Sequence, residues 1–245
     1  MASIIGRLFR AQWLADYYPL LGQVEHVKLD LDKLDALDIT PLDSPEPELI
    51  YLFKHIVTHE VTYESLPYAL RAQLHEQLAR YLEKQIAAGA FYETSLLETL
   101  VFHYTHSENK TKQREYLFKA GEAAQKSFAN DAALDYYGRL LPLLKDGKEQ
   151  IEIYLRRGQV LELMGKYDEA ERDYHTALNS ARDDKALNAS AQFELGKLNR
   201  LRGDYEPALA WLARAKEARA MLEDTRGLAQ VFIETGMVAS PSALG

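Results

Sequence analysis

Two histidine pairs are the residues of this chain whose spacing could support chemistry. His55 and His59 lie four residues apart, and His103 and His106 lie three apart. Either spacing can place two imidazoles on one helix face, where they could ligate a metal. Two ligands do not close a site, and neither pair has the glutamate and third ligand of a helical zinc motif. We therefore expect no metal and no cofactor.

Other catalytic motifs are missing from the sequence. The 245 residues include no cysteine, which excludes thiol catalysis, disulfides and cysteine-ligated zinc. The segments MGKY, DGKE and LGKL lack the leading glycine and the trailing hydroxyl residue of a phosphate-binding loop. No nucleophile–base set can be assembled, so we predict that the chain is not an enzyme.

The segment Ile151–Arg182 has the pattern of two short amphipathic helices joined by a tight turn. Small residues at Gly158 and Ala170 would let the helices approach closely, and large residues such as Tyr174 would fill the space around them. Small and large residues at these offsets resemble a tetratricopeptide (TPR) unit.

The repeat glycine recurs along the second half of the chain, at Gly121, Gly158, Gly196 and Gly236, in steps of 37, 38 and 40 residues. In the first unit Phe128 stands where the others have a turn glycine, and the last unit has only its first helix. One helical pair cannot bury its own apolar face, so stacked neighbours are expected. We predict a mainly α chain in which residues 91–245 form about three TPR-like repeats of a right-handed α-α superhelix.

Composition restricts the partners. The net charge of −8 disfavours nucleic acid held by bulk charge. No apolar run has the length of a membrane span, and no signal-peptide pattern opens the chain. We therefore expect no nucleic-acid partner, no membrane contact and a cytoplasmic location.

Residues 1–90 have a different pattern. A short apolar stretch and a helix within 1–22 precede a helix at 24–38, a proline-rich acidic loop at 39–49 and a strand at 49–53. This order suggests a winged-helix-like module. A helix through Glu64, a break at Pro67 and a long helix from Tyr68 to Ala87 follow, and Gly89 ends the long helix. Further helices are expected from Ser95 and from Lys112, separated by a polar turn.

A family resemblance rests on the stretch that begins at Tyr51, YLFKHIVTHEVTYESLPYALRAQLHEQLARYLE. It resembles bacterial multidomain signalling proteins that join an adenylate or guanylate cyclase domain, a STAND-class AAA-type ATPase, a winged helix and a TPR array. The upstream ASIIGRLF and the downstream FHYTHSENKTKQREYLFKAGEAAQKSF extend the resemblance over nearly the whole chain. Neither catalytic domain is present, which implies a fragment or a truncated relative.

The resemblance implies one nucleotide-sensing position. In STAND-type ATPases a winged-helix histidine near this place can contact the β-phosphate of the nucleotide. His55, with Lys54 beside it, is the matching candidate, and such a contact would exist only with an ATPase core. The alternative is a histidine that merely packs.

The array's usual role is to bind a peptide or protein on its concave side. The first-helix residues expected there are Glu152, Leu155, Gln159, Glu162, Phe193, Lys197 and Arg200. Their mixed charge indicates no ligand class, and a solvated face or self-association remains open. We expect the tyrosines at 136, 137, 154, 167 and 174 to pack between helices.

The last helix, Leu228–Val238, offers an apolar face with no helix after it. We expect this face to dock on the preceding repeat or to pair with another chain, because terminal repeats need a polar cap.

Three functions follow from these patterns. The first is a non-catalytic regulatory and scaffold segment, in which the winged helix relays the state of an ATPase and the repeats receive a partner. The second is a stand-alone TPR adaptor that binds a peptide. The third is a winged-helix regulator on DNA, which is disfavoured because the recognition helix Val24–Leu37 is acidic.

Overall fold

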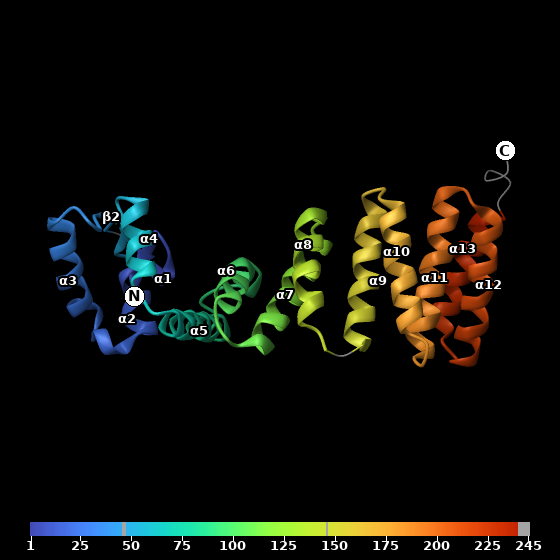
Figure 1. Ribbon diagram of the computed structural model, residues 1–245, viewed down its shortest axis with the longest axis horizontal. Helices are drawn as coiled ribbons and strands as arrows, with labels where there is room; N and C mark the ends of the chain where they lie inside the picture. The colour runs from blue at the N-terminus through green and yellow to red at the C-terminus, as the bar shows by residue number, and fades with distance from the viewer. Residues whose placement is uncertain (46–47, 146, 240–245) are drawn as a thin grey trace. The chain divides into compact units, whose positions relative to one another are not determined.

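The computed structural model describes residues 1–45, 48–145 and 147–239, and these residues are mainly helical (Figure 1). Pro47 and the C-terminal segment 240–245, which belong to the predicted loop and last repeat, lie outside the described residues. The chain forms two compact units, Met1–Tyr116 and Leu117–Gly245, and the helix α7 (Lys110–Lys126) contains the boundary. The predicted division of the chain at residue 90 stays a prediction, as does the handedness of the repeats.

Unit 1 opens with short elements around a small sheet. In chain order these are α1 (Ala2–Ile5), β1 (Leu8–Arg10), α2 (Ala11–Tyr17), the 3-10 turn η1 (Pro19–Leu21), α3 (Val24–Ala36), β2 (Leu42–Ser44) and β3 (Ile50–Leu52). The antiparallel sheet has the order β1-β3-β2. Phe9 faces Tyr51 across β1 and β3, and both side chains are buried with ring centroids 6.1 Å apart.

The sequence predicted only one of these strands. The expected strand at 49–53 is β3, whereas β1 falls in the stretch expected to be apolar and then helical, and β2 falls in the expected loop. Both missed strands have three residues, which is too short for an alternating pattern to stand out.

Three helices complete unit 1 before α7, and their bounds agree closely with those expected from the sequence. They are α4 (Ile56–Glu64), α5 (Tyr68–Ala87) and α6 (Glu93–Thr105). Pro67 separates the first two, and Gly89 follows α5 with φ +77°, a conformation that suits glycine. Leu74, Leu78 and Leu82 of α5 are fully buried, as expected for one face of an amphipathic helix.

Unit 2 is a succession of helices from the end of α7 onward. They are α8 (Asn130–Leu140), the 3-10 turn η2 (Leu141–Leu143), α9 (Gly147–Leu163), α10 (Tyr167–Ser180), α11 (Lys185–Arg202), α12 (Tyr205–Met221) and α13 (Thr225–Val238). The helices α7, α9, α11 and α13 are the first helices of successive pairs, and α8, α10 and α12 are the second helices. Each helix from α8 to α13 packs on the next along the chain.

The repeat glycines sit where first and second helices meet. A methyl group on Gly158 would lie 2.7 Å from Cδ1 of Tyr174, and one on Gly196 would lie 2.7 Å from Cγ of Leu212. Gly121 meets Tyr137 in the same way, at 2.8 Å from Cδ1. The predicted close approach of paired helices is therefore confirmed at three successive joints.

The turns within the pairs also match the pattern. Gly165 and Gly203 adopt positive φ angles of 73° and 86°. Phe128, which replaces the turn glycine in the first pair, adopts the same left-handed conformation with φ 59° although it carries a side chain. Among the predicted packing tyrosines, Tyr137 and Tyr174 are fully buried, while Tyr154 and Tyr167 pack half-buried against the core of unit 2.

Candidate functional site

The predicted partner-binding residues lie on α9 and α11, the first helices of two neighbouring pairs. Glu152 is exposed, whereas Gln159, Lys197 and Arg200 are half-buried. The remaining members of the set, Leu155, Glu162 and Phe193, are buried, with 8%, 8% and 9% of their surface exposed. The predicted face therefore contains buried residues and cannot be a simple solvated row.

Polar contacts link the two helices across this face. Nε2 of Gln159 donates to Oε1 of Glu194 at 2.6 Å, and Nζ of Lys197 lies 2.7 Å from Oε1 of Glu162. The hydroxyl of Tyr174 donates to the other oxygen of Glu162 at 3.3 Å. Charged and polar groups in a largely buried site hold one another in place, because a buried charge without a partner is costly.

The electrostatics of the cluster follow from burial and pairing. Burial raises the pKa of Glu194 above its usual value, and Lys197 and Gln159 only partly offset this effect. Burial acts to lower the pKa of Lys197, but the nearby carboxylates of Glu194 and Glu162 outweigh burial and raise it. Lys197 therefore stays protonated in the folded chain.

The same kind of contact recurs at successive first-helix joints. Arg156 of α9 lies 3.0 Å from Glu122 of α7, and Arg200 of α11 lies 2.6 Å from Glu234 of α13. With the Gln159–Glu194 contact between α9 and α11, every neighbouring pair of first helices in unit 2 has at least one polar link. We call these linked side chains the first-helix row. Its members are Glu122, Arg156, Gln159, Glu162, Glu194, Lys197, Arg200 and Glu234.

Two cations of the first-helix row, Lys197 and Arg200, are more exposed than the carboxylates they bind. The side chain of Lys197 is 28% exposed against 6% for Glu162, and that of Arg200 is 20% exposed against 13% for Glu234. The carboxylates are largely withdrawn from solvent, whereas both cations keep part of their surface exposed. This part of the row is therefore suited to contact a group that carries negative charge.

Lys54 and His55 lie at the end of β3. His55 precedes the first residue of α4 in an extended conformation and is exposed, and Lys54 forms an ion pair with Asp38. The guanidinium of Arg7 holds this turn by donating to the carbonyl oxygens of Phe53, at 3.1 Å, and of Lys54, at 3.2 Å. His55 is thus a surface residue on an anchored backbone.

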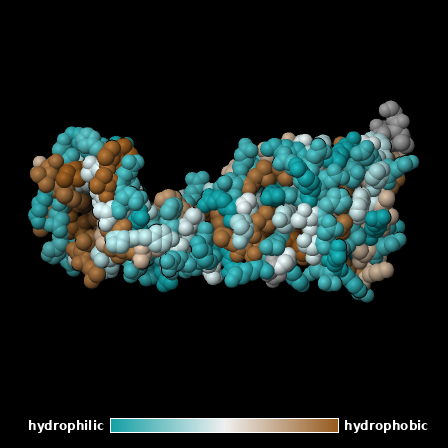
Figure 2. Space-filling model, in the orientation of Figure 1, coloured by the Kyte–Doolittle hydropathy of each residue, from teal (hydrophilic) through white to brown (hydrophobic). Residues whose placement is uncertain are grey.

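The helix that follows His55 exposes apolar side chains. Ile56, Val57 and Val61 are 51%, 62% and 64% exposed, and α4 buries none of its residues. Figure 2 shows hydrophobic residues on the surface of unit 1 at α4. An exposed apolar helix face beside His55 is a candidate contact surface.

A second histidine group, which sequence reasoning missed, is buried between α5 and α6. Nδ1 of His75 lies 2.8 Å from Nδ1 of His103, and the hydroxyl of Tyr63 lies 3.0 Å from Nε2 of His75. One Nδ1 must donate and the other accept, so a further proton would set two N–H groups against each other. Burial, followed by nearby cationic or protonatable groups including His106 and Arg71, lowers the pKa of His75 to about 4.

The members of each histidine pair singled out by spacing have different hydrogen-bond partners, although the rings of His103 and His106 both pack against His75 with centroids 5.1 Å away. His59 contacts the carbonyl oxygen of Ser3 at 3.0 Å, while His55 is exposed. His103 bonds to His75, and Nδ1 of His106 contacts the carbonyl oxygen of Phe102 instead. Within the described ranges no group of three or more histidine, aspartate or glutamate side chains is placed to hold a metal.

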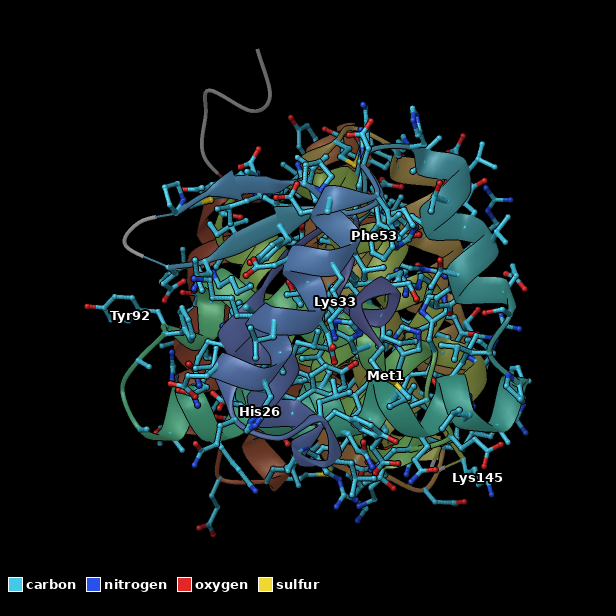
Figure 3. All side chains as sticks on the ribbon, turned by 90° about the vertical axis from the view of Figure 1, so that its left-hand side faces the viewer. Met1, His26, Lys33, Phe53, Tyr92 and Lys145 are labelled. Atoms are coloured by element: carbon cyan, nitrogen blue, oxygen red, sulfur yellow. The ribbon has the colours of Figure 1, made fainter. Side chains whose placement is uncertain are left out.

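The acidic helix α3 bears on the question of DNA binding. Figure 3 looks onto α3 and labels His26 and Lys33 along it. Asp30, Asp32 and Asp35 are exposed on the same helix, and Lys33 is bound by Asp30 at 2.8 Å. A helix with this charge balance would meet phosphate repulsion in a DNA groove.

Several residues of the first-helix row had no sequence signal of their own. Arg156, Glu194 and Glu234 share one position, two residues before the repeat glycines at 158, 196 and 236. Alignment of the repeats on these glycines could have shown that the position always carries a charge, but not which partner it binds.

A family comparison bears on unit 2. Residues 149–221, which span the pairs α9–α10 and α11–α12, match the family model for the tetratricopeptide repeat. These residues form TPR repeats, and unit 2 has the character of a protein-interaction scaffold. A search of curated proteins found no match.

Solved structures with a similar fold include three proteins from bacteria and archaea. BtubC (BKLC) from P. vanneervenii superposes with a TM-score of 0.54 at 20% identity, over 76% of this chain and 78% of that one. A signal transduction ATPase with numerous domains (STAND) that has a TPR sensor, from Pyrococcus horikoshii, gives 0.56 at 15% identity, over 89% of this chain and 33% of that one. Aspartyl phosphate phosphatase F from Bacillus subtilis gives 0.56 at 14% identity, over 93% of this chain and 59% of that one.

These likenesses establish a TPR-like helical fold. The chain spans about a third of the length of the STAND protein and 59% of the phosphatase. No helix of the described residues is long and apolar enough to cross a membrane.

Proposed function

We propose that unit 2 binds a protein or peptide partner through the first-helix row and has no catalytic role. The observation that carries this proposal is the row itself, in which polar links between α7, α9, α11 and α13 hold charged side chains at fixed positions. Prearranged charges lower the entropy lost when a partner binds.

The partner segment is expected to carry carboxylates. Lys197 and Arg200 keep part of their side-chain surface exposed, while Glu162 and Glu234 are largely withdrawn from solvent. Glu152 lies on the same helix as Glu162 and is exposed, so it marks one edge of the contact.

Site-specific photo-crosslinking tests this proposal in the full chain. A photoreactive amino acid at Glu152 should trap a partner whose crosslinked peptide is rich in Asp and Glu. The matched control places it at Arg214, an exposed residue of the second helix α12. Capture of the same peptide from both positions, or crosslinked peptides without acidic residues, would refute the assignment.

The order of elements in unit 1 supports a winged-helix-like module there. In chain order a helix, a strand, two helices and two further strands follow one another. The three strands form one sheet. We propose that this module contacts an ATPase core through α4, with His55 and Lys54 beside the bound nucleotide. The exposed Ile56, Val57 and Val61 support a protein contact at this place.

The wider setting proposed for this chain is a regulatory segment of a signalling ATPase or nucleotide cyclase. The sequence resemblance and the fold shared with the STAND protein both favour it. Co-purification with a separately expressed ATPase core tests this setting. We expect binding that depends on nucleotide and that His55→Ala weakens, with His26→Ala on the exposed face of α3 as the control. A complete lack of binding would favour the stand-alone TPR adaptor.

A further inference from the structure

A hollow lies inside unit 2 between the second helices α8 and α10, with the first helix α9 beside it. Its volume is about 420 Å³, within the range of roughly 300–1,000 Å³ that is usual for ligand sites. No residue that lines it belongs to the first-helix row. The lining residues are Leu134 of α8, Arg157 and Leu161 of α9, and Glu169, Arg172 and Asp173 of α10.

The corresponding junction between the second helices α10 and α12 is filled by an aromatic side chain. The indole of Trp211 on α12 packs edge-on against the ring of His175 on α10, with centroids 6.0 Å apart. Trp211 also packs against the apolar core of unit 2, and Cζ of Arg214 lies 4.7 Å from its ring centroid. A tryptophan of the chain itself therefore closes this junction.

The spacing of the repeats shows why the junction between α8 and α10 stays open. Gly138 lies 37 residues before His175, and Asp173 lies 38 residues before Trp211, which are the steps between the repeat glycines. A methyl group on Gly138 would meet no atom within 4 Å. The carboxylate of Asp173 binds Arg157, which donates to it twice at 2.6 Å. Glycine and aspartate thus stand where the next junction has its two rings.

An ion-pair clamp also closes the junction between α10 and α12. Arg202 of α11 lies 2.7 Å from Glu171 of α10. By the same steps, the positions of Arg202 and Glu171 correspond to Met164 and Leu134. Two apolar side chains cannot form an ion pair, so Leu134 is left as a wall of the hollow.

The lining of the hollow favours an uncharged aromatic ring. Its two leucines supply apolar walls, and aromatic rings pack well on guanidinium groups such as that of Arg157. Asp173 neutralises Arg157, and the exposed Glu169 and Arg172 carry one charge of each sign. No net charge therefore selects an ionic group.

We propose that the hollow between α8 and α10 binds one aromatic side chain of a partner protein, with a tryptophan indole as the preferred group. The indole takes the place that Trp211 fills one pair further along the chain. A second copy of this chain is a poor source, because Trp211 is held at its own junction and Trp13 packs against Tyr81 and Phe91.

The probe N-acetyl-tryptophanamide presents one indole without net charge, as a tryptophan within a peptide does. The full chain, with labelled leucine methyl groups, would be titrated with this probe and followed by NMR. We expect saturable shifts of the methyl signals of Leu134 and Leu161 in the millimolar range. N-acetyl-leucinamide, whose side chain is aliphatic, should bind at least about threefold more weakly, because it cannot stack on the guanidinium.

The variant Gly138→Phe tests the hollow on the protein side. Its phenyl group has open space in the unoccupied chain and starts one turn after Leu134 on the same face of α8. We expect probe binding at least about tenfold weaker, with unchanged circular dichroism. Ala132→Phe, at an exposed position of α8 that does not line the hollow, is the matched control and should bind the probe as the natural chain does.

Four results would overturn the proposal. They are methyl signals that do not shift at millimolar probe, binding that Gly138→Phe leaves unchanged, equal binding of N-acetyl-leucinamide, and at least about tenfold tighter binding of free tryptophan than of the amide. The last result would identify a free amino acid as the occupant. None of these results bears on the crosslinking test at Glu152, because the hollow and the first-helix row share no residue.

Discussion

Replacement of Gly158 by alanine should destabilise unit 2, although alanine is the better helix former. The added methyl group would lie 2.7 Å from Cδ1 of Tyr174, closer than two carbon atoms can pack. The tyrosine ring is fully buried, and its hydroxyl is bonded to Glu162, so it has little freedom to move away. Overpacking of this kind costs roughly 1–3 kcal/mol, and we expect the upper part of that range.

The matched variant is Gly236→Ala, because the same substitution there meets no atom within 4 Å. Alanine gains about 1 kcal/mol over glycine inside a helix. The net expectation is therefore a loss of about 2 kcal/mol for Gly158→Ala and a gain of about 1 kcal/mol for Gly236→Ala. The difference of about 3 kcal/mol isolates the steric cost, since the propensity term is common to both variants.

Urea denaturation followed by circular dichroism measures both free energies of unfolding. Hydrogen exchange of peptides from α9 and α10 should show that the loss is local to the joint between them. Equal stabilities for the two variants, within about 0.5 kcal/mol, would refute the reasoning that the repeat glycines are selected by close packing.

Three further predictions concern stability. The pKa values of His75 and His103, lowered by burial to about 4 and about 3, make the fold of unit 1 lose stability as pH falls below about 6.5. At pH 5 the His75 contribution alone is a loss of about 2 kcal/mol, and urea titrations from pH 8 to pH 4 should show a slope that His75→Leu/His103→Leu flattens. Phe128→Gly should stabilise unit 2 by about 1 kcal/mol, because Phe128 is 74% exposed and holds a left-handed conformation; an unchanged melting temperature would contradict this. Asp173→Asn should cost about 2 kcal/mol by chemical denaturation, because the buried carboxylate binds Arg157 through two contacts of 2.6 Å; a neutral result would mean that the pair is dispensable.

The repeating half of the chain could be predicted in detail from local pattern. The glycines, the apolar spacing and the turn positions recur with each pair, so periodicity and small residues together indicate paired helices. The break at Pro67 and the end of the long helix at Gly89 were also readable, since both residues act through their own backbone.

Contacts between distant residues could not be predicted in the same way. The strands β1 and β2 exist because three-residue segments find β3 as a neighbour, and such short segments carry no period of their own. The sequence by itself determined that this chain is built from paired helices with room at each glycine for a large side chain. Only the tertiary structure decided that His75 meets His103 and that charged side chains link the first helices. These contacts depend on which helices become neighbours. The packing of whole helix surfaces decides this, and no local sequence pattern does.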